Sequence, residues 1–127
     1  MMKTINTPHA PAAIGPYSQA KVVNGLVFVS GCIPLDPQTN TMVGDTIECQ
    51  AKQAIENLKA ILEASGSDLD HVVKTTCFLT DMANFNAFNT VYATYFTEKP
   101  ARSCFAVVAL PKAALVEIEA VAEVIGQ

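Results

Sequence analysis

Two segments near the C-terminus constrain the fold most, because each sets charged side chains in an otherwise apolar stretch. Residues 100–110 read PARSCFAVVAL, and Arg102 is the one charged residue among them. Residues 115–125 alternate, with apolar side chains at even positions and Glu117 and Glu119 at odd positions. A run rich in Phe and Val predicts a buried strand, whereas a period of two predicts a strand with one covered face. The sequence therefore predicts two C-terminal strands that carry an arginine and a pair of glutamates.

The chemistry of these three residues allows more than one interpretation. An arginine at the start of a buried strand needs an anion, because desolvating an unpaired charge is costly. A planar guanidinium can hold a carboxylate by two parallel hydrogen bonds. That carboxylate can belong to the protein, which makes Arg102 structural, or to a ligand. Glu117 and Glu119 project together, and one can be a solvated charge while the other is a general base that holds a water.

Further strands are predicted upstream. Residues 19–23 and 26–30 form two strands joined by a tight turn at Asn24 and Gly25, both of which tolerate positive φ. Residues 71–79 are rich in Val, Thr and Phe and predict a buried strand. A short strand is possible at residues 3–5. With the two C-terminal segments, these strands are enough for one sheet.

Two amphipathic helices separate the later strands. Asp45 is the expected N-cap of the first helix, with Glu48 as its capping-box partner and Gly66 as its stop. Asp81 is the expected cap of the second helix. The apolar residues recur at helical spacing and are interpreted as core: Ile47, Ala51, Ala54, Ile55, Leu58, Ile61 and Leu62 in the first helix, and Phe85, Phe88, Val91, Tyr92, Tyr95 and Phe96 in the second.

Length and charge narrow the classes of function. A chain of 127 residues is expected to form one domain, residues 1–127. Its net charge of -4 and pI near 5.0 disfavour a phosphate-binding surface, so a nucleic-acid partner is not expected.

Hydropathy and cysteine usage bear on the compartment. No apolar run approaches the ~20 residues of a membrane span, and the N-terminus lacks the apolar core of a secretory signal. The cysteines, Cys32, Cys49, Cys77 and Cys104, are far apart and indicate neither a zinc site nor a disulfide framework. We therefore expect a cytoplasmic protein without a membrane association.

The chain resembles the Rid family, the reactive intermediate (enamine/imine) deaminases that are also called YjgF-like proteins. The residues that carry the resemblance span nearly the whole chain in the family's order and spacing. They are AAIGPYSQA at 12–20, VSGCIP at 29–34, VKTT at 73–76, NTVY at 89–92, PARSCF at 100–105, LPK at 110–112 and VEIE at 116–119.

This resemblance implies an α+β fold of the chorismate-mutase-like type, in which two helices pack on a mixed sheet. It also implies a homotrimer whose three sheets close into a barrel, with ligand clefts between adjacent subunits. The composition agrees with such an assembly, because two helices cover only one face of a sheet and a monomer rarely exposes a large apolar face.

The implied activity is hydrolytic deamination of 2-enamine and 2-imine acids, such as 2-aminoacrylate, to 2-keto acids and ammonia. That is a 2-iminobutanoate/2-iminopropanoate deaminase, for which no cofactor or metal is implied. By resemblance, Arg102 binds the substrate carboxylate and Glu117 activates the attacking water. The remaining residues that the resemblance places around the small 2-imino or 2-keto acid are Tyr17, Ser30, Gly31, Asn89 and Cys104.

Two departures and two other functions bear on this hypothesis. Cys32 stands where many members carry Gln, and the link at residues 98–100 is shorter than in many members, so both affect the expected substrate preference.

An endoribonuclease or translation inhibitor is a second function within the family, disfavoured here by the acidic pI. A non-catalytic small-carboxylate binder or chaperone is a third. Glu117 separates the enzyme from the binder, since a pure carboxylate binder has no use for a second carboxylate.

Overall fold

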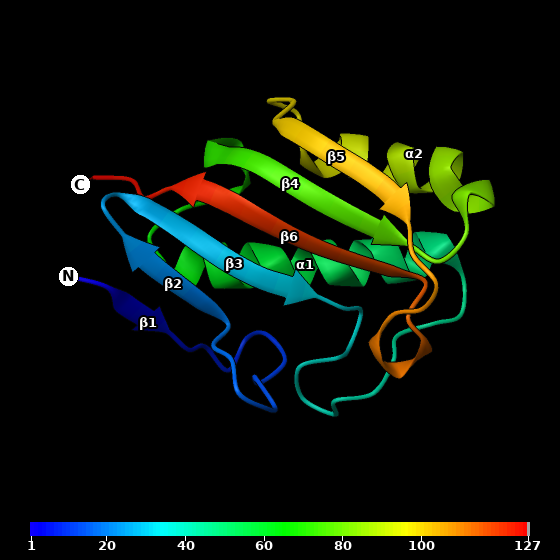
Figure 1. The fold of residues 1–127 in the computed structure, drawn as a ribbon, viewed down its shortest axis with the longest axis horizontal. Helices are drawn as coiled ribbons and strands as arrows, with labels where there is room; N and C mark the ends of the chain where they lie inside the picture. The colour runs from blue at the N-terminus through cyan, green and yellow to red at the C-terminus, as the bar shows by residue number, and fades with distance from the viewer. Residues whose placement is uncertain (127) are drawn as a thin grey trace.

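The computed structural model describes residues 1–126 and contains a six-stranded mixed sheet with two α-helices on one face (Figure 1). The predicted α+β class and the predicted order of elements are confirmed. No helix in the described part of the chain is long and apolar enough to cross a membrane. The strand order is β1-β2-β3-β6-β4-β5, which leaves the sheet open at β1 and β5. The elements are β1 (Lys3–Ile5), β2 (Ala20–Val23), β3 (Leu26–Cys32), α1 (Ile47–Ala64), β4 (Val72–Leu79), α2 (Phe85–Tyr95), β5 (Ala101–Ala106) and β6 (Val116–Glu123).

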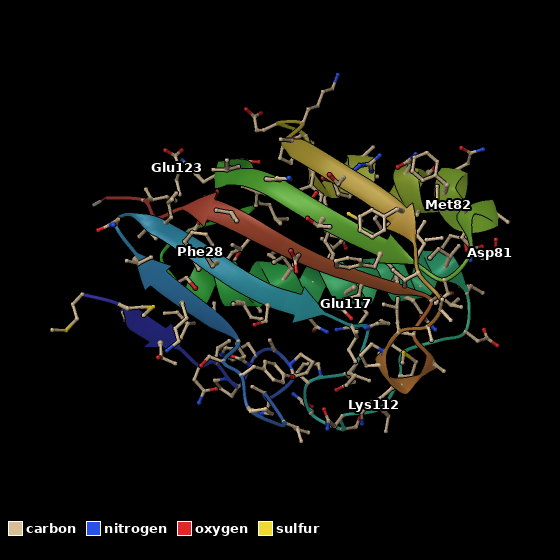
Figure 2. The ribbon with its side chains drawn as sticks, viewed as in Figure 1. Phe28, Asp81, Met82, Lys112, Glu117 and Glu123 are labelled. Atoms are coloured by element: carbon tan, nitrogen blue, oxygen red, sulfur yellow. The ribbon has the colours of Figure 1, made fainter. Side chains whose placement is uncertain are left out.

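The central strand, β6, separates a buried face from an uncovered one. It pairs antiparallel with β3 on one side and with β4 on the other. Its even-numbered residues from Val116 to Ala122 are buried under the helices, as the alternation predicts. Its odd-numbered residues, among them Glu117, project from the face that no helix covers. Figure 2 shows Phe28 and Glu117 on that face, with both helices behind the sheet.

The β2–β3 hairpin turns at Asn24 and Gly25, which have φ of 51° and 77°, as predicted. The return strand runs two residues past its predicted end, to Cys32. Its register against β6 shifts between Val29 and Cys32. This irregular stretch carries Ser30 and Gly31 alongside the start of β6, where Glu117 lies.

The prediction of a buried strand over residues 100–110 is wrong for the single chain. The strand ends at Ala106, and among the described residues it pairs with β4 alone, in parallel. Phe105 is 45% exposed and Val108 fully exposed. Apolar composition indicates that a segment prefers burial, but it does not indicate whether residues of the same chain or of another chain bury the segment. As the edge strand, β5 lacks a neighbour on its outer side within the described residues.

The helix starts differ from the predicted caps by a few residues. The cap of α1 is Thr46, not Asp45, and its side chain accepts a hydrogen bond from the Cys49 backbone N–H at 3.2 Å. Ile47, the first residue of the helix, is buried in the core. Asp81 caps a short 3-10 helix, Met82–Asn84, and α2 begins only at Phe85.

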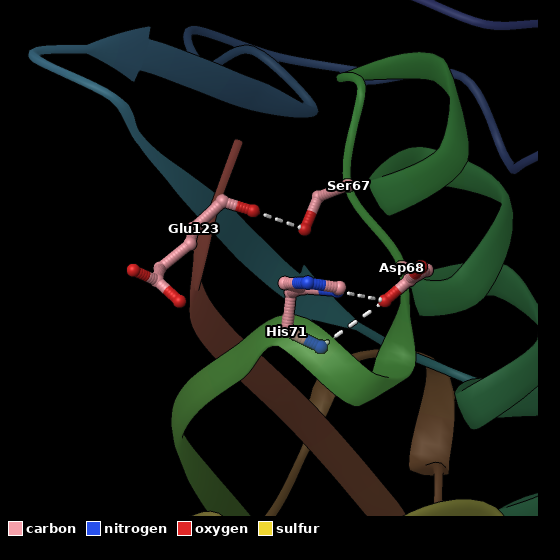
Figure 3. Close-up of polar contacts among 4 residues, drawn as sticks. All are labelled: Ser67, Asp68, His71 and Glu123. Carbon is pink, nitrogen blue, oxygen red and sulfur yellow. Dashed lines mark hydrogen bonds and ion pairs between the residues drawn. The ribbon is translucent and has the colours of Figure 1, made fainter. Parts of the chain in front are cut away.

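A polar cluster joins the end of α1 to the end of β6 (Figure 3). The Ser67 hydroxyl donates to the Glu123 carbonyl at 2.6 Å. Asp68 caps a 3-10 helix, Leu69–His71, and its carboxylate contacts Nδ1 of His71 at 2.6 Å. The hydrogen bond raises the pKa of His71 and lowers the pKa of Asp68. The strand predicted from residue 71 therefore begins one residue later, because His71 belongs to this turn.

The turn before β6 holds two non-glycine residues in the left-handed region. Lys112 and Ala113 both have φ of 57°. Because this conformation crowds a Cβ, we expect Ala113→Gly to raise the free energy of unfolding by about 1 kcal/mol. Ala109→Gly, in the same connection but without a positive φ, should instead lower that free energy, since it only loosens the unfolded chain. Urea denaturation of both variants checks this, and shifts of the same sign would contradict it.

Candidate functional site

The residues implied by the resemblance, with the exception of Cys104, fall into two separate cavities of the chain. Tyr17, Ser30, Gly31 and Glu117 line a cavity of about 640 Å³. A second cavity, of about 550 Å³, is lined by a different group that includes Arg102 and Asn89. Within one chain the predicted site is therefore divided.

The pairing of the strands shows why the arginine and the glutamate do not meet. Arg102 lies opposite Thr75 on β4, whose side chain is buried on the helix side of the sheet. Glu117 lies opposite Phe78, on the other side. The two functional groups thus project from opposite faces of the same sheet.

The Glu117 carboxylate lies directly over Gly31 in the first cavity. A Cβ at position 31 would collide with Oε2 of Glu117, so this approach requires a glycine. Burial raises the pKa of Glu117, and the negative charge of neighbouring Glu119 raises that pKa further. A half-buried carboxylate with a raised pKa is the form in which a glutamate can act as a base and return the proton as an acid.

The N-terminal arm, residues 6–19 between β1 and β2, forms one wall of this cavity. The Ser30 hydroxyl donates to the Ser18 carbonyl at 2.6 Å, and the exposed Tyr17 ring stands at the rim. The buried Gln19 fastens the arm: its Nε2 donates to carbonyls of Thr7 and Pro11 at 3.1 and 2.9 Å. Ser30 and Gln19 therefore position the wall, and Tyr17 is the aromatic side chain of the arm that lines the cavity.

Cys32, the first departure from the family pattern, also lines the first cavity. Burial and the charge of Glu117 raise the pKa of Cys32 to about 12, so its thiol stays protonated. A neutral thiol of this kind supplies volume and low polarity next to the carboxylate, and it is a poor nucleophile.

The Arg102 guanidinium is held by three residues of α2 in the second cavity. Its Nη1 donates to Oδ1 of Asn89 at 2.8 Å. Its central carbon lies 4.8 Å from the ring centroid of Tyr92 and 5.6 Å from that of Phe85. Within residues 1–126, Arg102 makes no ion pair with a carboxylate. The remaining N–H groups can therefore receive an anion from outside the chain, which favours the ligand interpretation over the structural one.

Cys104 lies on the same side of β5 as Arg102 and directly opposite Cys77 on β4. Burial raises the pKa of Cys104, although the Arg102 charge partly opposes this. Its thiol is thus protonated near neutral pH and lines neither cavity. The link at residues 98–100, the second departure, contributes Lys99 and Pro100 to the second cavity.

Two residues that line the first cavity, Lys112 and Asn57, were missed from the sequence. Lys112 brings a cation to the rim of the first cavity from its strained turn, and it is labelled in Figure 2. Asn57 donates to the carbonyls of Ile33 and Leu35 at 3.0 and 2.9 Å and so holds the loop after β3. Asn57 lies within the apolar stripe of α1. A polar residue in such a stripe is the one signal in the sequence that could have identified Asn57 as a structural hydrogen-bond donor.

Comparison with known proteins agrees with the motifs. Residues 7–124 match the family model described as Endoribonuclease L-PSP. The 2-iminobutanoate/2-iminopropanoate deaminase of Salmonella typhimurium is 48% identical, over 96% of this chain and 98% of the relative. Relatives at 50–52% identity include proteins named RutC family protein.

Solved structures match equally well. A conserved Rid family protein, YyfA of Yersinia pestis, superposes with a TM-score of 0.95 at 47% identity, over 98% of this chain and all of that one. TdcF of E. coli with bound serine gives a TM-score of 0.91 at 42% identity, over 95% and 98% of the two chains. The chain therefore belongs to the Rid family, also called YjgF-like, to which the Endoribonuclease L-PSP model refers.

Proposed function

We propose that this protein hydrolyses reactive 2-imino and 2-enamino acids, such as 2-aminoacrylate, to 2-keto acids and ammonia. The proposal rests on the environments of the Arg102 guanidinium and the Glu117 carboxylate. Arg102 is held in place without an ion-pair partner in the described chain, and Glu117 is half-buried with a raised pKa. The name of the Salmonella relative and the serine bound in TdcF, an amino acid with a carboxylate, support the same substrate class.

A second copy of the chain is proposed to complete the site. Because Arg102 and Glu117 project from opposite faces, one substrate can contact both only if the two residues come from different copies. The uncovered face exposes Phe28 and Phe105, and such apolar side chains favour burial in an assembly. We therefore propose a homotrimer in which sheets close into a barrel and the small 2-imino or 2-keto acid binds in the cleft between subunits.

The reaction needs a carboxylate clamp and one acid–base group. Arg102 holds the substrate carboxylate by paired hydrogen bonds. Glu117 takes a proton from a water as the water oxygen attacks the imine carbon, and the protonated Glu117 gives that proton to the nitrogen, which yields a carbinolamine. Glu117 then takes the proton of the carbinolamine hydroxyl and delivers it to the amine, so that the carbon–nitrogen bond breaks and ammonia leaves as the carbon–oxygen double bond forms. Overall, one imine and one water give one ketone and one ammonia. Tyr17, Ser30, Gly31 and Asn89 shape the cleft, and the Cys104 backbone borders it.

The raised pKa of Glu117 makes a pH prediction. The base must be deprotonated, so kcat/KM should fall as the pH decreases through a pKa above the usual glutamate value. Glu119→Gln removes the neighbouring negative charge, which lowers the pKa of Glu117. The acid limb of the pH profile, where kcat/KM falls with decreasing pH, should therefore move to lower pH in this variant. Glu123→Gln, further along the same strand face, should leave the limb in place. An acid limb that does not move in Glu119→Gln would contradict the assignment of Glu117.

The proposed setting is metabolite damage control in the cytoplasm. All four cysteines are free thiols, which supports a reducing compartment. The endoribonuclease in the family model's description is the alternative. A nuclease could use His71 as a general base, but His71 is hydrogen-bonded to Asp68 and lines neither cavity, which disfavours the endoribonuclease alternative.

The direct test is release of 2-keto acid from 2-aminoacrylate generated in the assay by a dehydratase. We expect the protein to accelerate the release above the spontaneous rate while cleaving no RNA. Binding of 2-ketobutyrate without acceleration would identify a carboxylate binder and overturn the enzymatic proposal.

A further inference from the structure

The guanidinium of Arg102 rests on one stripe of α2. Phe85, Asn89 and Tyr92 are spaced by four and three residues, so they share a helix face. Asn89 engages one nitrogen, and the two rings lie within cation–π distance of the guanidinium carbon, Tyr92 the closer at 4.8 Å. Tyr92 itself stacks on Phe96, with ring centroids 4.3 Å apart. The support under the guanidinium is thus continuous with the buried core.

One buried hydrogen bond locks that support to the sheet. The Tyr92 hydroxyl lies 2.7 Å from Oγ1 of Thr75, whose side chain is completely buried. Thr75 is the residue directly opposite Arg102 in the β4–β5 pairing. The same position along the sheet therefore fixes both the backbone of Arg102 and the ring beneath its side chain. Burial also raises the pKa of Tyr92, which keeps the hydroxyl neutral.

We propose that Tyr92 is a positioning residue for carboxylate binding, and that Thr75 holds Tyr92 in place; this rests on the proposed role of Arg102. Two parallel hydrogen bonds to a carboxylate require a guanidinium of fixed plane. A long side chain that is already ordered loses less conformational freedom when the ligand binds. The Tyr92 ring sets the plane, and the Thr75 bond keeps the ring from turning away.

Four variants separate positioning from general packing. Tyr92→Leu removes the ring, whereas Tyr92→Phe removes only the hydrogen bond to Thr75. Thr75→Val removes that same bond and also the weak one that the Cys77 thiol donates to Thr75 Oγ1 at 3.8 Å. Tyr95→Phe is the matched control, because it deletes a hydroxyl from the same helix that bonds Glu56 at 2.8 Å and lines neither cavity. The readouts are Kd for 2-ketobutyrate by calorimetry, and KM and kcat for 2-aminoacrylate, with circular dichroism to verify folding.

We expect Tyr92→Leu to raise Kd and KM by roughly three- to thirtyfold, with a smaller change in kcat. Tyr92→Phe and Thr75→Val should each raise Kd by about two- to tenfold, and their combination should do no more than Thr75→Val alone, because both variants remove the same Tyr92–Thr75 bond. Tyr95→Phe should bind as the wild type does. If Tyr92→Leu does not fold, the Tyr92→Phe and Thr75→Val pair decides the matter.

Two results overturn the inference and can be told apart. If Arg102→Ala weakens binding while the folded Tyr92 and Thr75 variants match Tyr95→Phe, Tyr92 only packs and the proposed function stands. A fall in kcat with unchanged Kd and KM has the same meaning, because it reports a smaller active fraction. If Arg102→Ala binds 2-ketobutyrate as tightly as the wild type does, the proposed function fails and the inference fails with it.

Discussion

Replacing Arg102 with alanine is expected to abolish deamination and 2-ketobutyrate binding while the fold persists. The change leaves the ligand carboxylate without its charged partner, and such a loss costs about 2–5 kcal/mol, or roughly 30- to 4,000-fold in affinity. The fold should survive, because the side chain is only partly buried and makes a single hydrogen bond within the described residues, to Asn89. Lysine should restore little, since it offers a point charge in place of a planar fork. Steady-state rates and calorimetry measure both effects.

The control for Arg102→Ala is Lys52→Ala, which removes one positive charge from an exposed position on α1. Unchanged activity in this control would show that the loss is specific to the guanidinium and not to net charge. If Arg102→Ala has wild-type rates, Arg102 does not bind the substrate, and the proposed class of carboxylate substrates is contradicted.

Replacing Glu117 with glutamine should lower kcat by about 10²–10⁴-fold, the usual contribution of a positioned acid–base group. Glutamine keeps the shape that fits over Gly31 but cannot accept the proton from water. Binding of 2-ketobutyrate should survive, because Arg102 still holds the carboxylate. The pair of measurements, kcat by keto-acid release and Kd by calorimetry, separates loss of chemistry from loss of binding.

Glu119→Gln is the matched control for this change. Glu119 lies two residues away on the same face and is exposed, so its loss should reduce kcat less. If Glu119→Gln is inactive and Glu117→Gln has normal activity, the general base is Glu119 and the assignment of Glu117 is wrong. If the wild type and both variants bind ligand and none accelerates deamination, the protein is a carboxylate binder.

Local features were predictable from the sequence because local interactions decide them. The Asn24–Gly25 turn follows from backbone sterics, and the buried face of β6 follows from its alternation. The cap of α1 was missed by one residue, because Asp45 and Thr46 are adjacent and both are favourable N-cap residues. Where two signals of similar strength compete, tertiary packing chooses.

The arrangement of the site could not be derived from residue patterns. Strand order decides that Arg102 and Glu117 face opposite sides, and strand order depends on pairings between distant segments. The exposure of β5 has a similar origin, since an edge strand and a central strand can share one composition. The contact between Tyr92 and Thr75 also had no local signal, because it joins a helix and a strand that each appear regular.

A mixing experiment tests most directly whether the site is shared between two copies. Arg102→Ala and Glu117→Gln chains, each inactive alone, are unfolded together in equal amounts and refolded, and native mass spectrometry verifies mixed oligomers. If each cleft takes its arginine from one chain and its glutamate from the next, random assembly should restore about a quarter of the wild-type activity. Mixed oligomers that remain inactive would contradict a site divided between copies.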